Sequence, residues 1–164
     1  MISGGVSQGI EPIVANVYAQ KTSKGTFIRK NPALQRLLES KGLDTFDVWM
    51  QMDAEGGSVA NIKGLSAEEK EVFLTAREIN QHAIIKLAAQ RQKWIDQGQS
   101  INLFFAAPAT LSTEDKKKLG KYIHEVHLEA WKAGIKSLYY CRSESVLKAD
   151  NIYRSSSECK ACEG

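Results

Sequence analysis

Ile101-Asn102-Leu103-Phe104-Phe105 is a short apolar stretch that predicts a mostly buried strand. A helix is expected to follow from Ser112-Thr113 to Gly134, because Ser is a favoured N-cap and Gly a favoured helix stop. Ile135-Lys136-Ser137-Leu138-Tyr139-Tyr140 is again typical of a strand. Strand, helix and strand in this order form a βαβ unit, which favours a parallel pair of strands with the helix packed across it. Two strands cannot close a sheet, so their outer edges need a neighbour.

The residues before this unit predict a hairpin and two helices. Residues 13–18 and 25–28 are strand-like and flank a polar turn at residues 20–24. Asn31-Pro32 then opens a helix that ends at Gly42, because Asn caps well and Pro fits the first helical position. A short helix is expected over about residues 44–52.

A capping box marks the next helix, with Ser66 at the cap and Glu69 three residues later. Apolar residues recur at helical spacing from there towards Ile95, and Asn80 could cap a second helix after a break. The apolar positions of this predicted stripe are Val72, Phe73, Ala76, Ile79, Ile84, Leu87, Ala88 and Trp94.

Composition places the chain among globular proteins. It has 164 residues, of which 43% are hydrophobic and 25% charged, so it is long enough for one domain or for a piece of a larger one. The net charge of +3 does not indicate a nucleic-acid partner, and the Lys116-Lys117-Lys118 cluster is interpreted as a solvated helix face. No apolar run reaches the roughly 20 residues of a membrane span, and no signal peptide is visible. A cytoplasmic location is therefore expected.

Three cysteines do not suggest a disulfide framework. Cys159 and Cys162 form a CxxC pair near the end of the sequence, which can cycle between dithiol and disulfide. Residues 145–164 are polar and predict a flexible, redox-active tail. Zinc binding and an incidental motif remain alternatives for the pair, although zinc usually needs four ligands.

Two further groups of side chains, a tyrosine pair and three histidines, could in principle carry chemistry. Tyr139 and Tyr140 could be packing residues or a radical relay, and a stacked pair would require a distorted strand end, because adjacent strand residues point to opposite faces. His82, His124 and His127 are not completed by carboxylates at ligand spacing, so no metal site is expected.

Four motifs in order resemble the C-terminal part of the class I ribonucleotide reductase large (α) subunit. They are Gly9-Ile10-Glu11-Pro12, residues 96–103, residues 130–140 and Cys159-Lys160-Ala161-Cys162. The resemblance runs from about Ser3 onwards. It implies an α/β fold, the C-terminal portion of a ten-stranded α/β barrel, helix-rich with few strands and a flexible tail. It also implies the reduction of ribonucleoside diphosphates to deoxyribonucleotides by a radical mechanism.

The resemblance assigns roles to four residues. Tyr139 and Tyr140 match the tyrosine pair that carries the oxidising equivalent from the small (β) subunit to a buried cysteine, with Tyr140 as the outer member. Cys159 and Cys162 match the dithiol that re-reduces the active-site disulfide and is itself reset by thioredoxin or glutaredoxin. Cys141 matches no cysteine with a role and is expected to be a partly buried bystander.

The departures from the family imply a partner. All three cysteines are placed, so the radical-forming cysteine and the active-site pair must come from elsewhere. The chain has its own Met1, and we therefore expect one product of a split subunit, in which a larger N-terminal α fragment binds most of the ribonucleotide substrate. No cofactor is expected on this chain; the radical cofactor, expected to be di-iron tyrosyl, belongs to the β subunit.

The resulting hypothesis divides the chain into a barrel part at residues 1–144 and a redox-active tail at residues 145–164. We expect no reductase activity from the chain alone, and no membrane or nucleic-acid partner. The alternative is a stand-alone helical interaction module with a thiol-redox tail. It would be a well-folded monomer by itself, whereas a fragment of a barrel would gain order when its partner is added.

Overall fold

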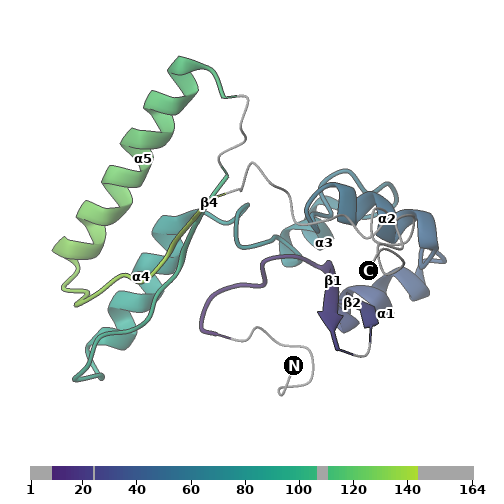
Figure 1. Cartoon of the computed structure of the whole chain (residues 1–164), viewed down its shortest axis with the longest axis horizontal. Coiled ribbons are helices and arrows are strands. Elements are labelled where there is room, and N and C mark those ends of the chain that lie inside the picture. Colours follow the sequence, from purple (N-terminus) through teal and green to yellow (C-terminus); the bar gives the residue numbers. More distant parts are fainter. Residues whose placement is uncertain (1–8, 24, 107–110, 144–164) are drawn as a thin grey trace, which may run out of the picture. The chain divides into compact units, whose positions relative to one another are not determined.

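The computed structural model describes residues 9–23, 25–106 and 111–143 (Figure 1). These residues form two compact units. The hairpin unit comprises residues 12–75, and the βαβ unit comprises residues 9–11 together with residues 76–143. Each has its own hydrophobic core.

The hairpin unit begins with two antiparallel strands, β1 at Val17–Thr22 and β2 at Gly25–Lys30. The predicted hairpin is confirmed, but its strands are displaced along the chain. Residues 13–16 are not part of the ladder because Asn16 is buried and bonds elsewhere: its backbone N–H donates to the carbonyl of Gly57 at 3.1 Å. Most of the predicted turn instead extends β1 as far as Thr22.

Helices α1 at Pro32–Ser40 and α2 at Phe46–Ala54 follow the hairpin. The Asn31 side chain accepts a hydrogen bond from the backbone N–H of Ala33 at 3.0 Å, so the predicted cap is confirmed. The predicted capping box at Ser66 and Glu69 is also present, and it starts α3 at Ala67–Val72. The core that these elements enclose consists of Val17, Leu34, Leu38, Trp49, Met52, Val59, Ile62, Leu65 and Phe73.

The predicted apolar stripe after Ser66 is wrong in part. The first helix, α3, stops at Val72, and α4 starts only at Gln81. Asn80 caps α4, which confirms the predicted alternative of a second helix after a break. The break is stabilised by the Gln81 side chain, whose Nε2 donates to the carbonyls of Ala76 and Ile79 at 2.9 and 2.7 Å. Three members of the stripe, Val72, Leu87 and Trp94, are exposed rather than buried.

The βαβ unit contains α4 at Gln81–Gln92, β3 at Leu103–Phe105, α5 at Thr113–Lys132 and β4 at Cys141–Ser143. Strands β3 and β4 are parallel, as predicted. Figure 1 shows α4 and α5 as the long helices of this unit. Its core consists of Ile84, Ile85, Ala88, Ile101, Leu103, Phe105, Val126 and Ala130.

The second strand of this pair is not where the sequence placed it. Residues 135–140 are extended but lie outside the regular strand, which starts at Cys141. The chain leaves α5 through Gly134, whose φ of 74° requires a residue without a side chain, and the N–H of Ile135 donates back to Ala130 at 3.1 Å. The chain therefore turns at Gly134, and residues 135–140 lead from this turn to the start of β4.

The described residues contain two sheets of two strands each, so no closed barrel exists among them. This agrees with the expected helix-rich α/β architecture with few strands. Within the described residues, no helix combines the length and apolar composition that crossing a bilayer requires.

Candidate functional site

Tyr139 and Tyr140 lie where the chain meets β3. The N–H of Tyr139 donates to the carbonyl of Ile101 at 2.8 Å, and the N–H of Leu103 donates to the carbonyl of Tyr140 at 2.9 Å. These two backbone bonds extend the parallel pairing by one step beyond β3 and β4. The position of the tyrosines is therefore set by residues 101–103.

The two tyrosine rings contact each other. Their centroids are 4.1 Å apart and their planes are inclined by 56°. Adjacent residues in a regular strand would point to opposite faces, so the contact depends on the irregular backbone just before β4. This is the distorted strand end that a stacked pair was expected to require. Tyr139 is 61% exposed and Tyr140 51% exposed, so packing covers less than half of each residue.

Electrostatics distinguish the two phenols. A hydrogen bond with Tyr140 raises the pKa of Tyr139, burial acts in the same direction, and the positive charge of Arg142 opposes both. The guanidinium carbon of Arg142 lies 5.0 Å from the centre of the Tyr140 ring, within the range of a cation–π contact.

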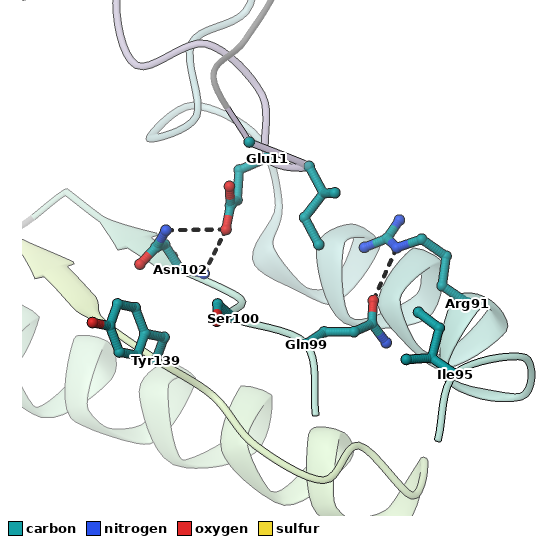
Figure 2. A pocket seen from close by; sticks show the side chains of 9 residues that line it. Glu11, Arg91, Ile95, Gln99, Ser100, Asn102 and Tyr139 are labelled. Carbon is teal, nitrogen blue, oxygen red and sulfur yellow. Dashed lines mark hydrogen bonds between the residues drawn. The ribbon is translucent and has the colours of Figure 1, made fainter. Parts of the chain in front are cut away.

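Tyr139 also lines an open pocket of about 450 Å³ (Figure 2). On the opposite side, one carboxylate oxygen of Glu11 accepts hydrogen bonds from the backbone N–H and the side-chain Nδ2 of Asn102, at 2.8 and 3.1 Å. Arg91 donates to the side chain of Gln99 at 3.0 Å and closes another side of the pocket. The lining of the pocket therefore includes Tyr139 and two hydrogen-bonded polar pairs, Glu11 with Asn102 and Arg91 with Gln99.

Comparison with known proteins assigns the chain to a protein family. Residues 1–141 match the family model described as ribonucleotide reductase, barrel domain. The chain belongs to this family. Its helix-rich α/β architecture is thus part of the reductase barrel, and the resemblance drawn from the four sequence motifs is confirmed.

Individual relatives agree with this assignment. The chain is 39% identical to the ribonucleoside-diphosphate reductase large subunit of Invertebrate iridescent virus 3, over 100% of this chain and 26% of that protein. It is 45% identical to the large subunit of Invertebrate iridescent virus 6, over 93% of this chain and 15% of that protein. The solved α subunit of the Actinobacillus ureae class Id ribonucleotide reductase superposes with a TM-score of 0.67 at 42% identity, covering 83% of this chain and 22% of its own. The chain thus spans about a quarter or less of the length of these reductase relatives.

The cysteines of this reductase-family chain are divided between described and undescribed residues. Cys141 is exposed in β4, so the expectation that it is partly buried is wrong. All three residues of β4 are exposed, because the strand has β3 on one side and no described strand on the other. Cys159 and Cys162, and the whole predicted tail, lie outside the described residues.

The histidines do not form a metal site in the described part of the chain, where no group of three or more potential ligands comes together. His82 pairs through its Nδ1 with Glu129 of α5. His124 and His127 are exposed on α5, and the Nδ1 of His127 contacts the carbonyl of Ile123 at 2.7 Å. The three histidines therefore occupy surface and helix-packing positions.

Three polar residues around the tyrosines were not recognised as site residues from the sequence. Glu11 and Asn102 fall inside motifs that carry the family resemblance, but they are 91 positions apart and nothing in the sequence joins them. Arg142 follows the tyrosine pair by two positions, which is a local signal for a cation near a phenol.

Proposed function

We propose that this chain is the C-terminal part of a ribonucleoside-diphosphate reductase α subunit. In this role Tyr139 and Tyr140 carry an oxidising equivalent towards the active site, and Cys159 and Cys162 return reducing equivalents to it. Family membership supports the reaction class. The contact between the two tyrosine rings is the observation that carries the proposal.

The geometry suits a two-step relay. A phenol is oxidised by one electron most readily when its proton moves at the same time to a hydrogen-bonded acceptor. Tyr139 has a hydrogen-bond partner in Tyr140, and the two ring centroids are 4.1 Å apart. When Tyr140 is oxidised, it takes an electron and the hydroxyl proton from Tyr139, which leaves Tyr140 neutral and the radical on Tyr139. Tyr139 lines the pocket, which supports the role of inner member that the family resemblance gives it.

In this proposal the remaining parts of the reaction lie outside these 164 residues. A larger N-terminal fragment of the α subunit would supply the radical-forming cysteine and the active-site pair, since this chain has only three cysteines. The same fragment would bind most of the ribonucleotide and pair with the open sheet edges of the βαβ unit. The β subunit would hold the radical cofactor, and no cofactor is proposed for this chain.

The tail dithiol closes the redox cycle. Each ribonucleotide reduction leaves the active-site thiols as a disulfide. Thiolate exchange with Cys159 and Cys162 would break that disulfide and transfer it to the tail, where thioredoxin or glutaredoxin would reduce it.

Replacing either tyrosine tests the relay. In the reductase assembled from this chain, the larger α fragment and the β subunit, Tyr139→Phe and Tyr140→Phe should each abolish turnover, because Phe packs similarly but has no hydroxyl proton to lose. Turnover is measured as deoxyribonucleotide formed, and assembly is checked by size-exclusion chromatography. Tyr18→Phe, on β1 of the hairpin unit, is the matched control and should keep full activity. Near-normal turnover in either test variant would remove that residue from the relay.

A second experiment separates the tail from the relay. Cys159→Ser should allow one turnover of pre-reduced enzyme and then stop, because the active-site disulfide can no longer be exchanged. The measurement is product per active site with thioredoxin and its reductase present. Sustained cycling would refute the shuttle. Reductase activity of the isolated chain would refute the need for a larger fragment. A well-folded monomer that does not bind the larger fragment would instead favour a stand-alone interaction module.

A further inference from the structure

We propose that Glu11 and Asn102 are positioning residues for the tyrosine pair, with Glu11 fixing Asn102 and Asn102 fixing the backbone that holds Tyr139 and Tyr140. This inference rests on the proposed relay function of the tyrosines. It assigns a role to two residues that line the same pocket as Tyr139 (Figure 2).

The backbone around Asn102 holds both tyrosines. The residue before it, Ile101, accepts the hydrogen bond from the N–H of Tyr139, and the residue after it, Leu103, donates to the carbonyl of Tyr140. Asn102 therefore lies between the two bonds that place the pair. Since both phenol side chains are more than half exposed, packing does little to hold them, and a shift of residues 101–103 would move both rings.

Glu11 is the group that holds Asn102 in place. A single carboxylate oxygen accepts from both the backbone N–H and the Nδ2 of Asn102, at 2.8 and 3.1 Å, as Figure 2 shows. Bonds to an ionised carboxylate are stronger and more directional than those between neutral groups. The backbone bond fixes the strand, and the side-chain bond fixes the orientation of the amide.

The orientation of the Asn102 amide has a cost that a purely structural contact would not need. A carboxylate only accepts, so the amide must turn its NH₂ towards Glu11 and its oxygen away. The Oδ1 atom of Asn102 is then buried and has no hydrogen-bond partner among the described residues. Unsatisfied buried acceptors are rare because they cost free energy. Asn102, which lines the pocket together with Tyr139, nevertheless keeps this unpaired acceptor. This is consistent with a Glu11–Asn102 contact that serves to position the two tyrosines.

The first test measures the tyrosine itself in the full chain. With isotope-labelled tyrosine ζ carbons, NMR titration gives the pKa of Tyr139, which the hydrogen bond to Tyr140 now raises. Glu11→Leu should separate the phenols and lower this pKa towards the ordinary tyrosine value. Asn102→Ala, which keeps the backbone bond to Glu11, should lower it less. Glu11→Gln should retain most of the shift, because the amide oxygen can still accept.

The control is a matched pair elsewhere in the chain. Glu55 accepts from the Nδ2 of Asn61 at 3.2 Å in the hairpin unit, so Glu55→Leu removes a similar contact far from the tyrosines in sequence. It should leave the Tyr139 pKa unchanged. An unchanged Tyr139 pKa in folded Glu11→Leu or, if that variant does not fold, in folded Asn102→Ala would overturn the proposal.

The second test measures turnover in the assembled reductase. Glu11→Leu should lower it by about 100-fold, the effect expected when reacting groups are misplaced by about 1 Å, and Glu11→Gln should restore most of it. Full turnover in a folded Glu11→Leu enzyme, with Tyr139→Phe inactive, would overturn the positioning role alone. An active Tyr139→Phe enzyme would overturn the relay, while the NMR titration would still decide whether Glu11 places Tyr139.

Discussion

The hairpin unit and the βαβ unit satisfy their buried polar groups in different ways. In the hairpin unit, Asn16 is 1% exposed, and both its side-chain nitrogen and its side-chain oxygen form hydrogen bonds within the unit. Its Nδ2 donates to the carbonyls of Gly57 and Phe73 at 3.0 and 2.7 Å, and its Oδ1 accepts from Asn31 at 2.9 Å. The Asn16 amide thus connects the start of the hairpin to the glycine turn at Gly56-Gly57 and to the end of α3 at Phe73.

The βαβ unit leaves comparable groups open. Asn102 has a buried acceptor without a partner among the described residues, and the whole of β4 is exposed. Tyr139 and Tyr140 lie beside this open strand. The difference is local: Asn16 forms all of these side-chain hydrogen bonds within the hairpin unit, whereas Asn102, next to the backbone that holds the tyrosines, lacks a partner for Oδ1 among the described residues.

The largest expected effect tests whether the two cores are separate. Leu38 and Ile85 are both fully buried, one in each unit. Leu38→Ala should cost about 2–5 kcal/mol, because it removes buried methyl groups and leaves a cavity. We expect amide hydrogen exchange to accelerate in the hairpin unit and to stay slow in the βαβ unit, with the reverse for Ile85→Ala. Loss of protection in both units from either substitution would show that they unfold as one.

A smaller effect is expected at the glycine turn that helps to close the hairpin unit. Gly57 has a φ of +85°, and a Cβ there would lie 2.7 Å from the Cα of Ala15 and 2.8 Å from the backbone nitrogen of Asn16. Gly57→Ala should therefore cost about 1–3 kcal/mol through crowding, in addition to the backbone strain. Gly56→Ala is the control, because Gly56 also has positive φ but open space at its Cβ. Equal denaturation midpoints for the two variants would contradict the crowding.

Local chemistry explains what could be predicted from the sequence. The Asn31 cap and the Ser66–Glu69 capping box each involve residues within one helical turn, so their structure follows from spacing alone. The order of strand, helix and strand likewise predicted the parallel pairing of β3 with β4. The contact between the two adjacent tyrosines at a distorted strand end could be anticipated as a possibility, although the start of the regular strand at Cys141 was not predicted.

The misses have a different physical origin. Helical spacing shows which residues are apolar but not what covers them, so the predicted apolar stripe includes Leu87 and Trp94 although both are exposed. The contact between Glu11 and Asn102 joins distant segments, and no single-sequence pattern records such a pairing. Cys141 was expected to be partly buried, but its strand has a described neighbour on one side only.

The smallest expected effect concerns acid. Two carboxyls in the hairpin unit have a lowered pKa: the hydrogen bond from Trp49 is the main cause for Asp44, and the bond from Lys41, at 2.8 Å, is the main cause for Glu69. A carboxyl whose pKa is lower in the folded than in the unfolded state stabilises the fold above its unfolded pKa. That contribution disappears as the pH falls through the folded pKa.

The hairpin unit should therefore lose part of its stability as the pH falls below the ordinary glutamate pKa of 4.5. Glu69→Gln keeps an acceptor for the Ser66 N–H but removes the charge that faces Lys41, so it should reduce the acid-dependent loss. Glu68→Gln, an exposed position in the same helical turn, is the control and should leave the loss unchanged. Denaturant unfolding at pH 7 and at pH values below 4.5, followed by residue-resolved NMR, measures both variants. If Glu69→Gln keeps the full pH dependence of the wild type, the ion pair with Lys41 does not contribute to closing the hairpin unit.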